Sequence, residues 1–197
     1  MFTGIITDVG RIEEISRTKD LKLTIKTDYK HKELLIGSSI ACSGPCLTIV
    51  ESRDNLFSVE VSNETISKTN ISTWAEGHLI NLEKGLKVGD EIGGHFVTGH
   101  VDGIIRLLDK KQDAGSIILT FQQDKEFKMF IAPKGSVTID GVSLTINESF
   151  ENEFTVNIID HTQKNTTLGN LDIGQYVNIE VDMFARYIYQ INKNYSL

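Results

Sequence analysis

The sequence predicts an all-β protein built as a tandem pair of similar barrels, with a short helix at the C-terminus. Two observations carry this prediction. Matching residues recur at a constant offset of 97 positions along the chain. In addition, short runs rich in Val, Ile, Thr and Phe, separated by glycines, alternate apolar with polar residues, which is typical of strands with one buried face.

The repeat is clearest where SIACSGPCLTI, residues 39–49, matches SVTIDGVSLTI, residues 136–146. One offset held over several separated blocks indicates the tandem duplication of a unit just under 100 residues long. The further matches, in the same order, are 58–61 with 155–158, Thr65 and Thr69 with Thr162 and Thr166, 77–83 with 174–180 and, slightly shifted, 2–4 with 97–99.

Each repeat unit is expected to form a small β-barrel. The alternation is plain in Leu21–Ile25 and in Phe57–Val61. A unit of this size that buries one core most naturally closes into a barrel, because closure removes exposed sheet edges. We expect a first barrel over residues 1–94, a second over 95–183 and a tail over 184–197.

The spacing of large apolar residues in the tail, at i, i+3, i+4 and i+7, predicts an amphipathic helix. An isolated helix of about 12 residues is marginal in water, so it should pack against something. Self-association and folding back onto its own barrel both remain open. Shorter helical stretches are expected at 65–72 and 126–131. The apolar residues of the tail are Phe184, Tyr187, Ile188, Ile191 and Tyr195.

Composition narrows the class of protein. The chain has 197 residues, 40% apolar and 24% charged, which is ordinary for a globular protein. No apolar run is long enough to span a membrane, and residues 1–4 do not resemble a secretory signal, so we expect a cytoplasmic protein. The net charge of −7 argues against nucleic acid or an anionic membrane as a partner.

The histidines and cysteines favour a pocket over a metal site. His95 and His100 lack the spacing of zinc ligands, and the C-x3-C pair lacks the spacing of a redox motif. Alternation places Cys42 in the core as a small apolar residue. Cys46 follows a Gly-Pro turn and its counterpart in the second repeat is Ser143, which suits the mouth of a pocket.

The residues alone therefore predict two similar pockets and one set of polar groups, Ser39, Cys46, His100 and Asp182. Glycines near these groups would allow a ligand to approach the backbone. Two equivalent pockets in one chain fit either a binder of two similar ligands or an enzyme that joins two similar molecules.

Several longer motifs stand in a fixed order over nearly the whole chain. They are MFTGII at 1–6, GPCLT at 44–48, GHFVTGHVDG at 94–103, KG at 134–135 with DGVSLT at 140–145, HT at 161–162 with TTLG at 166–169, and VNIEVD at 177–182. Together they closely resemble the riboflavin synthase family, in the alpha-chain type built of two lumazine-binding repeats.

The resemblance implies two six-stranded Greek-key barrels per subunit and a homotrimer held together by the C-terminal helix. It implies a transferase that dismutates two molecules of 6,7-dimethyl-8-ribityllumazine. One molecule gives a four-carbon unit to the other, forming riboflavin and 5-amino-6-(D-ribitylamino)uracil in the last step of riboflavin biosynthesis. The reacting pair would lie between the N-terminal barrel of one subunit and the C-terminal barrel of its neighbour. No metal or cofactor is implied, and lumazine synthase is a candidate partner for association.

The resemblance also implies site residues. His100 would serve as base or proton relay, Asp182 would polarise or orient, and Cys46, Ser39 or a held water would add to C7 of the donor. The first pocket would be lined by Phe2, Thr3, Gly4, Ile5, Ile6, Cys46, Leu47, Thr48, Glu60, Val61, Ser62, Asn63, Glu64 and Thr65. The second would be lined by Gly99, His100, Val101, Lys134, Ser143, Leu144, Thr145, Ile159, Asp160, His161, Thr162, Gln163 and Lys164.

Two departures from the family pattern stand out. The chain has Ser43-Gly44-Pro45 where the family commonly has Asn-Gly-Val or Asn-Gly-Cys. Proline fixes φ and removes one N–H donor, so the loop before Cys46 is expected to shift or to lose one ligand contact. The chain also ends soon after the tail helix, which would shorten the stalk of a trimer.

Three other functions compete with this one. A non-catalytic lumazine- or flavin-binding antenna of the same fold tends to have a degenerate second repeat, whereas both repeats here keep Gly-x-[Cys/Ser]-Leu-Thr-Ile. A flavin-binding reductase barrel would need a following α/β nucleotide-binding domain, and the chain has no βαβ pattern. A purely structural oligomerisation module leaves the paired pocket motifs unexplained.

Overall fold

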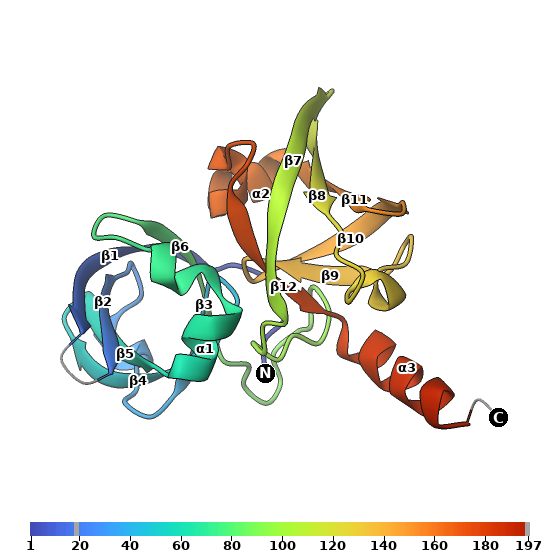
Figure 1. Ribbon diagram of the computed structural model, residues 1–197. Helices are drawn as coiled ribbons and strands as arrows, with labels where there is room; N and C mark the ends of the chain where they lie inside the picture. Colours follow the sequence, from blue (N-terminus) through green and yellow to red (C-terminus); the bar gives the residue numbers. More distant parts are fainter. Residues whose placement is uncertain (18–19, 196–197) are drawn as a thin grey trace.

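The computed structural model describes residues 1–17 and 20–195 and consists of two closed barrels of six antiparallel strands each (Figure 1). The first barrel has the strand order β1-β2-β5-β4-β3-β6. Its strands are β1 (Asp8–Arg17), β2 (Leu21–Lys26), β3 (Ser39–Cys42), β4 (Cys46–Arg53), β5 (Leu56–Val61) and β6 (Leu79–Lys84).

The second barrel repeats the first strand for strand. Its closed order is β10-β11-β8-β7-β12-β9, which is the same cyclic order with each strand replaced by its repeat equivalent. The predicted fold class is confirmed. The strands are β7 (Gly103–Asp113), β8 (Ser116–Gln122), β9 (Ser136–Ile139), β10 (Val142–Ser149), β11 (Glu153–Ile159) and β12 (Tyr176–Val181).

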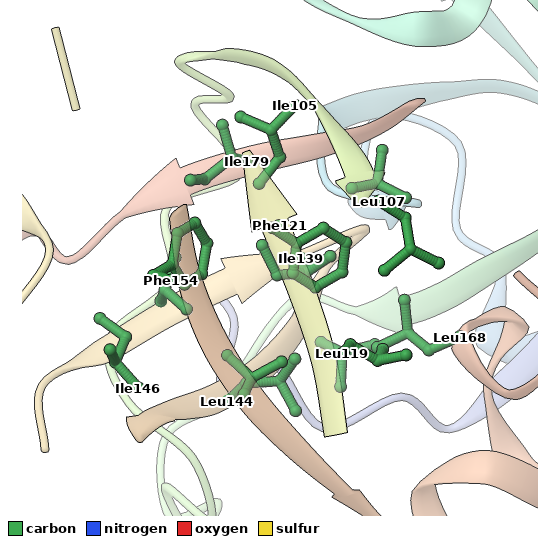
Figure 2. Close-up of a cluster of buried hydrophobic side chains, with 14 of the residues drawn as sticks. Ile105, Leu107, Leu119, Phe121, Ile139, Leu144, Ile146, Phe154, Leu168 and Ile179 are labelled. Carbon is green, nitrogen blue, oxygen red and sulfur yellow. The ribbon is translucent and has the colours of Figure 1, made fainter. Parts of the chain in front are cut away.

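Each barrel encloses its own hydrophobic core, built from the inward-facing positions of its strands. In β8, Ile117, Leu119 and Phe121 are buried while the residues between them are half-exposed. Figure 2 shows the second core, where Phe121 and Phe154 face each other from neighbouring strands with ring centroids 5.8 Å apart. The apolar and polar residues that alternate in the sequence therefore face the inside and the outside of each barrel.

Short helices close the barrels, at boundaries that differ from those predicted. α1 (Asn63–Lys68) begins before Thr65, because the Ser62 hydroxyl accepts a hydrogen bond from the Thr65 N–H and caps the helix there. It ends at Lys68 because Thr69 is extended. The stretch expected at 126–131 forms only a 3₁₀ turn, η3 (Lys128–Phe130); Pro133 follows closely and disfavours helical backbone before it. The equivalent of α1 in the second barrel is α2 (Asp160–Asn165), and the remaining 3₁₀ turns are η1 (His31–Glu33), η2 (Asn70–Thr73) and η4 (Thr167–Asn170).

Two buried asparagines join the barrels. The Asn81 amide, fully buried, donates to the Asp140 carbonyl at 2.9 Å and accepts from the Thr167 N–H at 2.8 Å. Its repeat equivalent, Asn178, donates to the Ser43 carbonyl at 2.7 Å and accepts from the Asn70 N–H at 2.8 Å. Each barrel therefore binds the other through the same residue, which places the two units around a pseudo-twofold axis.

Two glutamates fix the chain segments that cross between the barrels. Glu83 accepts the N–H and hydroxyl of Thr3 and the N–H of Gly4, at 2.7–2.9 Å. Glu180, the repeat equivalent, binds Thr98 and Gly99 in the same way. Between these two clamps, Phe2 and Val97 pair in an antiparallel bridge across the pseudo-twofold axis. The shifted sequence match of 2–4 with 97–99 thus has a structural counterpart.

The predicted tail helix is confirmed as α3 (Met183–Tyr195), which projects away from both barrels (Figure 1). The Asp182 carboxylate accepts the Phe184 N–H and caps the helix. Arg186 forms an ion pair with Asp102 at 2.7 Å, and Tyr189 packs edge-on against Phe130. The first two turns of the helix therefore contact the second barrel, while Phe184, Tyr187, Ile188 and Ile191 stay more than half exposed. Among the described residues, no helix has the length and apolar content needed to cross a membrane.

The interface between the barrels contains one titratable group whose charge should govern stability. Asp140 is buried, and burial raises its pKa from 3.8 to about 7. The folded protein then holds this proton more tightly than the unfolded chain, so stability is full below about pH 4 and falls as the pH rises towards 7. Asp140→Asn keeps the acceptor for the Asn178 N–H and removes the charge. We expect it to raise the free energy of unfolding at pH 8 by up to about 4 kcal/mol.

This prediction is tested by urea denaturation at pH 4 and pH 8. The gain from Asp140→Asn should vanish at pH 4, where the native carboxyl is protonated as well. Asp54→Asn is the matched control, because Asp54 has the same left-handed backbone (φ 52° against 44°) but is exposed. A gain of equal size at both pH values would contradict the assignment.

Candidate active site

Each crossing segment, residues 3–4 and residues 98–99, lies against the barrel formed by the other repeat. The Cys46 N–H, in the first barrel, donates to the Gly99 carbonyl at 2.9 Å, and the Ser143 N–H, in the second, donates to the Gly4 carbonyl at 2.8 Å. The expected allocation of these two segments is therefore wrong. Gly99 lies with Cys46 and Gly4 lies with Ser143, so each candidate pocket is built from both barrels.

The neighbours of the crossing segments agree with this exchange. Ile6 packs against the core of the second barrel, while Val101 lies over Gly44 of the first. Gly4 and Gly99 both have φ near +75°, and a Cβ on either would lie 2.5 Å from the Cβ of the residue it faces. Only glycine fits at these two positions, because both the backbone conformation and the space demand it.

The first pocket has a row of polar side chains on the outer surface of its barrel. Ser39 pairs with Thr48 across β3 and β4, and Thr48 pairs with Glu60 across β4 and β5. All three are exposed, and they alternate with core residues. Cys46 lies on the same face of β4 as Thr48 and packs beside Phe2, Ala41 and Val97. The strand register thus brings Ser39, Cys46, Thr48 and Glu60 to one surface of the barrel.

The second pocket repeats this row and adds His95, which is bound to two of its hydroxyls. Ser136 pairs with Thr145 across β9 and β10. The Ser143 hydroxyl hydrogen-bonds to Nδ1 of His95 at 2.7 Å, and the Thr138 hydroxyl contacts Nε2 at 3.2 Å. Burial lowers the pKa of His95, and the nearby Asp182 carboxylate offsets part of that effect. A half-buried imidazole held between two hydroxyls is a group able to exchange a proton.

The two pockets are therefore equivalent in position and different in chemistry. Where the first has Ala41 and the thiol of Cys46, the second has Thr138 and the hydroxyl of Ser143 bound to His95. Asn157, the counterpart of Glu60, has a buried side-chain oxygen without a hydrogen-bond partner among the described residues. Such an atom calls for an explanation, and a bound ligand would supply one.

The four expected catalytic residues do not form one cluster. Ser39 and Cys46 belong to the first barrel, and His100, which follows Gly99, is exposed beside them. Asp182 instead caps α3 and lies near His95. Within the described residues, no hydrogen bond or ion pair joins Ser39 or Cys46 to His100 or Asp182, so a substrate or a water would have to connect them.

Several residues expected to line the pockets have side chains in other places. Leu47, Val61 and Leu144 point into the barrel cores, so only their backbones are available to a ligand. Phe2 is fully buried between the barrels. The side chain of Ile159, by contrast, is 61% exposed. The remaining helix-turn positions of the two expected sets, Ser62, Asn63, Glu64, Thr65, Asp160, His161, Thr162, Gln163 and Lys164, lie at or in the N-terminal parts of α1 and α2, next to the ends of β5 and β11.

The expected disturbance at Pro45 is absent. Ser43 and Gly44 have φ of 48° and 115°, and their equivalents Asp140 and Gly141 have φ of 44° and 79°. Both hairpins therefore make the same left-handed turn, and Pro45 occupies the place of Val142 at the start of the following strand. The proline leaves Cys46 paired with Ala41, in register with the second barrel.

A cavity of about 340 Å³ lies next to His100, between the second barrel and the start of α3. Its walls include Asp102, which accepts the Val181 N–H and binds Arg186 with both carboxylate oxygens at 2.7–2.8 Å. This ion pair ties the first turn of α3 to the segment that carries His100. Among the described residues, no three His, Cys, Asp or Glu side chains come together as metal ligands would.

Sequence reasoning missed the functional importance of His95 and of the two clamps. From the sequence, His95 is weighed only as a metal ligand. Glu83 and Glu180 were matched as repeat equivalents, but only the structure connects them with Thr3 and Thr98. The available signal was an acid that recurs in both repeats, as the Thr-Gly pair does at a slightly shorter offset.

The fold and these pockets define a class of protein, a two-barrel binder of small molecules with two related sites. A family model, the lumazine binding domain, matches residues 3–85 and again 98–182. The riboflavin synthase of Brucella abortus (strain 2308) is 45% identical over 193 residues, covering 95% of this chain and 96% of the relative. That of Bacillus subtilis (strain 168) is 37% identical over 191 residues, covering 96% and 89%. The chain belongs to the riboflavin synthase family and carries its lumazine-binding domain twice.

Solved structures support the same fold. LumP complexed with 6,7-dimethyl-8-(1'-D-ribityl) lumazine superposes with a TM-score of 0.80 at 22% identity, covering 92% of this chain and 99% of that one. LumP complexed with riboflavin gives a TM-score of 0.84 at 23% identity, covering 92% and 100%.

The close approach of Gly99 to Cys46 leads to a stability prediction. Gly99→Ala forces a side chain into left-handed backbone and against Cys46, so it should separate the crossing segment from the first barrel. Gly37→Ala is the matched control, because Gly37 has φ +86° but no atom near its Cβ position. We expect Gly99→Ala to cost about 2–4 kcal/mol more than Gly37→Ala in urea denaturation. Equal costs would mean that the contact with Cys46 does not constrain the segment.

Proposed function

We propose that this protein is a riboflavin synthase, which converts two molecules of 6,7-dimethyl-8-ribityllumazine into riboflavin and 5-amino-6-(D-ribitylamino)uracil. The observation that carries the proposal is the pair of equivalent pockets, each completed by a segment clamped to the other barrel. A reaction between two copies of one substrate needs two similar sites at fixed separation. Positioning of this kind can supply about 7–11 kcal/mol of the barrier.

The proposed chemistry divides between the pockets. The transfer moves a four-carbon unit from donor to acceptor, so atoms balance without an oxidant or cofactor. A proton must leave the 7-methyl group of one lumazine, and His100 or the His95–Ser143 pair is placed to accept it. Addition of Cys46, Ser39 or a held water at C7 would activate the donor. The first pocket contains the thiol, so we assign donor activation there.

The polar rows supply the binding groups in this proposal. Thr48 and Glu60 in one pocket, with Thr145 and Asn157 in the other, present hydroxyl, carboxylate and amide groups suited to ribityl hydroxyls. Exposed backbone of the crossing segments and the helix-turn positions after β5 and β11 would pair with the pyrimidinedione edge. Lys134, exposed at the mouth of the second barrel, would hold the ring carbonyl side.

We further propose that the working form is a homotrimer of cytoplasmic subunits, held through the exposed apolar face of α3. Tyr187, Ile188 and Ile191 are 55–60% exposed on a helix whose other side already contacts the second barrel. An apolar face of this kind is expected to pack on a second copy of the chain. Association with lumazine synthase belongs to the same proposal as a further, weaker contact.

The activity is tested with the lumazine as sole substrate. Riboflavin should appear by absorbance with a final yield of half an equivalent per lumazine. His100→Ala should lower turnover roughly a hundredfold while leaving lumazine affinity largely intact, and Cys46→Ser should also slow turnover. Tight binding without riboflavin would favour the antenna function instead. Unchanged rates in both variants would mean that the chemistry lies elsewhere.

The assembly is tested separately with Ile188→Asp, which places a charge on the exposed face of α3. Light scattering coupled to gel filtration should then report monomers where the unaltered chain forms trimers. If the reacting pair lies between subunits, riboflavin formation should be lost while lumazine still binds each chain. Val88→Asp, the same kind of change at a fully exposed residue outside α3 and both pockets, is the control for handling and folding. A monomeric variant with full activity would refute the shared site.

A further inference from the structure

A second cavity, of about 680 Å³, opens between the two barrels and lies apart from the paired pockets. Its volume falls in the range of small-molecule sites, about 300–1,000 Å³. Of the residues that line it, only Lys164 belongs to the expected lumazine-binding set. The interbarrel cleft, as we name it, is bordered mainly by η2, η4 and the turns before β6 and β12.

The interbarrel cleft lies on the pseudo-twofold axis, because repeat equivalents face each other across it. Its opposing pairs include Asn70 with Thr167, Trp74 with Leu171 and His78 with Gln175. The pairs are not identical, so the two walls differ. One wall has the imidazole of His78 stacked on the indole of Trp74, with centroids 5.8 Å apart and planes 19° apart. A planar ring would find a stacked aromatic pair on that side, and the opposite wall adds the single ring of Tyr176.

Polar groups along the cleft need partners that the protein does not supply. Thr167 Oγ1 is buried and has no hydrogen-bond partner among the described residues. The Ser43 hydroxyl accepts the Asn81 N–H and keeps its own hydrogen to donate. The Asp140 carboxyl is 94% buried in the cleft wall, with one oxygen bound to the Asn178 N–H. A buried hydroxyl left unpaired is unfavourable, so its retention beside the cleft points to a ligand.

These groups select one chemical class. The carboxyl and hydroxyls deep in the cleft call for a ligand edge that both donates and accepts hydrogen bonds, since Ser43 has a hydrogen to donate, and the aromatic wall calls for a planar ring. A phosphate is disfavoured, because Lys164, a cation in the lining, already pairs with Asp160 at 2.7 Å. A small uncharged nitrogen heterocycle with amino substituents fits both demands.

We propose that the interbarrel cleft binds an aminopyrimidine, with its ring on the His78 side and its amino edge towards Asp140 and Thr167. The inference rests on the proposed function in one respect, since the pyrimidine product of that reaction contains such a ring. The cleft would then hold a product away from the paired pockets. Because η2 and η4 donate to the interface asparagines, a ligand there would act on the joint between the barrels.

The test uses 6-aminouracil as the probe and Trp74 as the reporter. Trp74 is the single tryptophan of the chain and lies in the cleft wall, so its fluorescence reports on this site. Binding measured by fluorescence and by calorimetry should weaken about tenfold in Thr167→Val. Thr73→Val is the matched control, because Thr73 lines the same cleft but its hydroxyl already donates to the Asn70 carbonyl at 2.7 Å. It should leave the affinity within about twofold.

Competition separates the cleft from the paired pockets. Probe affinity should be unchanged when 6,7-dimethyl-8-ribityllumazine saturates those pockets, with calorimetry as the readout because the lumazine absorbs light. Displacement of the probe, or equal affinity in Thr167→Val and the unaltered protein, would overturn the proposal. Absence of both heat and fluorescence change would do so too. Riboflavin formation is measured independently, so failure of the cleft site and failure of the proposed enzyme activity remain distinguishable.

Discussion

The reciprocal bonds of Asn81 and Asn178 are the constraint on which the rest of the molecule depends. Each amide is buried and satisfied by the other barrel, with backbone partners at Ser43, Asp140 and the turns η2 and η4. A buried amide tolerates few orientations, because each lost bond leaves an unpaired group. Two such amides related by a pseudo-twofold axis therefore fix one barrel against the other, and with it the place where the crossing segments meet.

From this fixed joint follows the sharing of the pockets. The crossing segments are clamped by the glutamate of one barrel and accept a strand N–H from the other, so neither pocket is complete in a single repeat. Duplication alone would give two identical sites. The two sites nevertheless differ, because His95 binds the Ser143 hydroxyl in one of them. The thiol of Cys46 and the hydroxyl of Ser143 thus occupy one position in two different environments.

The sequence was a good guide to what each repeat does alone and a poor guide to what the repeats do together. The alternation of apolar and polar residues predicted the strands, because the polarity of each residue indicates whether its side chain faces the core. The apolar periodicity near the C-terminus predicted α3 in the same way. The shifted match of residues 2–4 with 97–99 showed that Gly4 and Gly99 are equivalent, but equivalence does not say which copy of a partner each one touches. The sequence pattern is equally compatible with Gly4 beside Cys46 and with Gly4 beside Ser143. Only the orientation of the two barrels at their interface selects Ser143. Asp182 illustrates the same limit, since a carboxylate that caps a helix and one that orients a substrate look alike in sequence.

The contact between α3 and the second barrel connects the helix proposed for subunit assembly with the segment that carries His100. Asp102 lies two residues after His100, in the segment that Glu180 holds. Asp102 also binds Arg186, near the start of α3. A partially exposed ion pair alone would contribute little, but here one guanidinium nitrogen of Arg186, Nη2, donates to both carboxylate oxygens, and the carboxylate also accepts a strand N–H. Moving the helix axis would therefore strain the backbone beside His100 before it disturbed either barrel core. A contact between subunits on α3 would restrict that movement. Subunit packing would therefore be coupled to the position of the proposed base, His100.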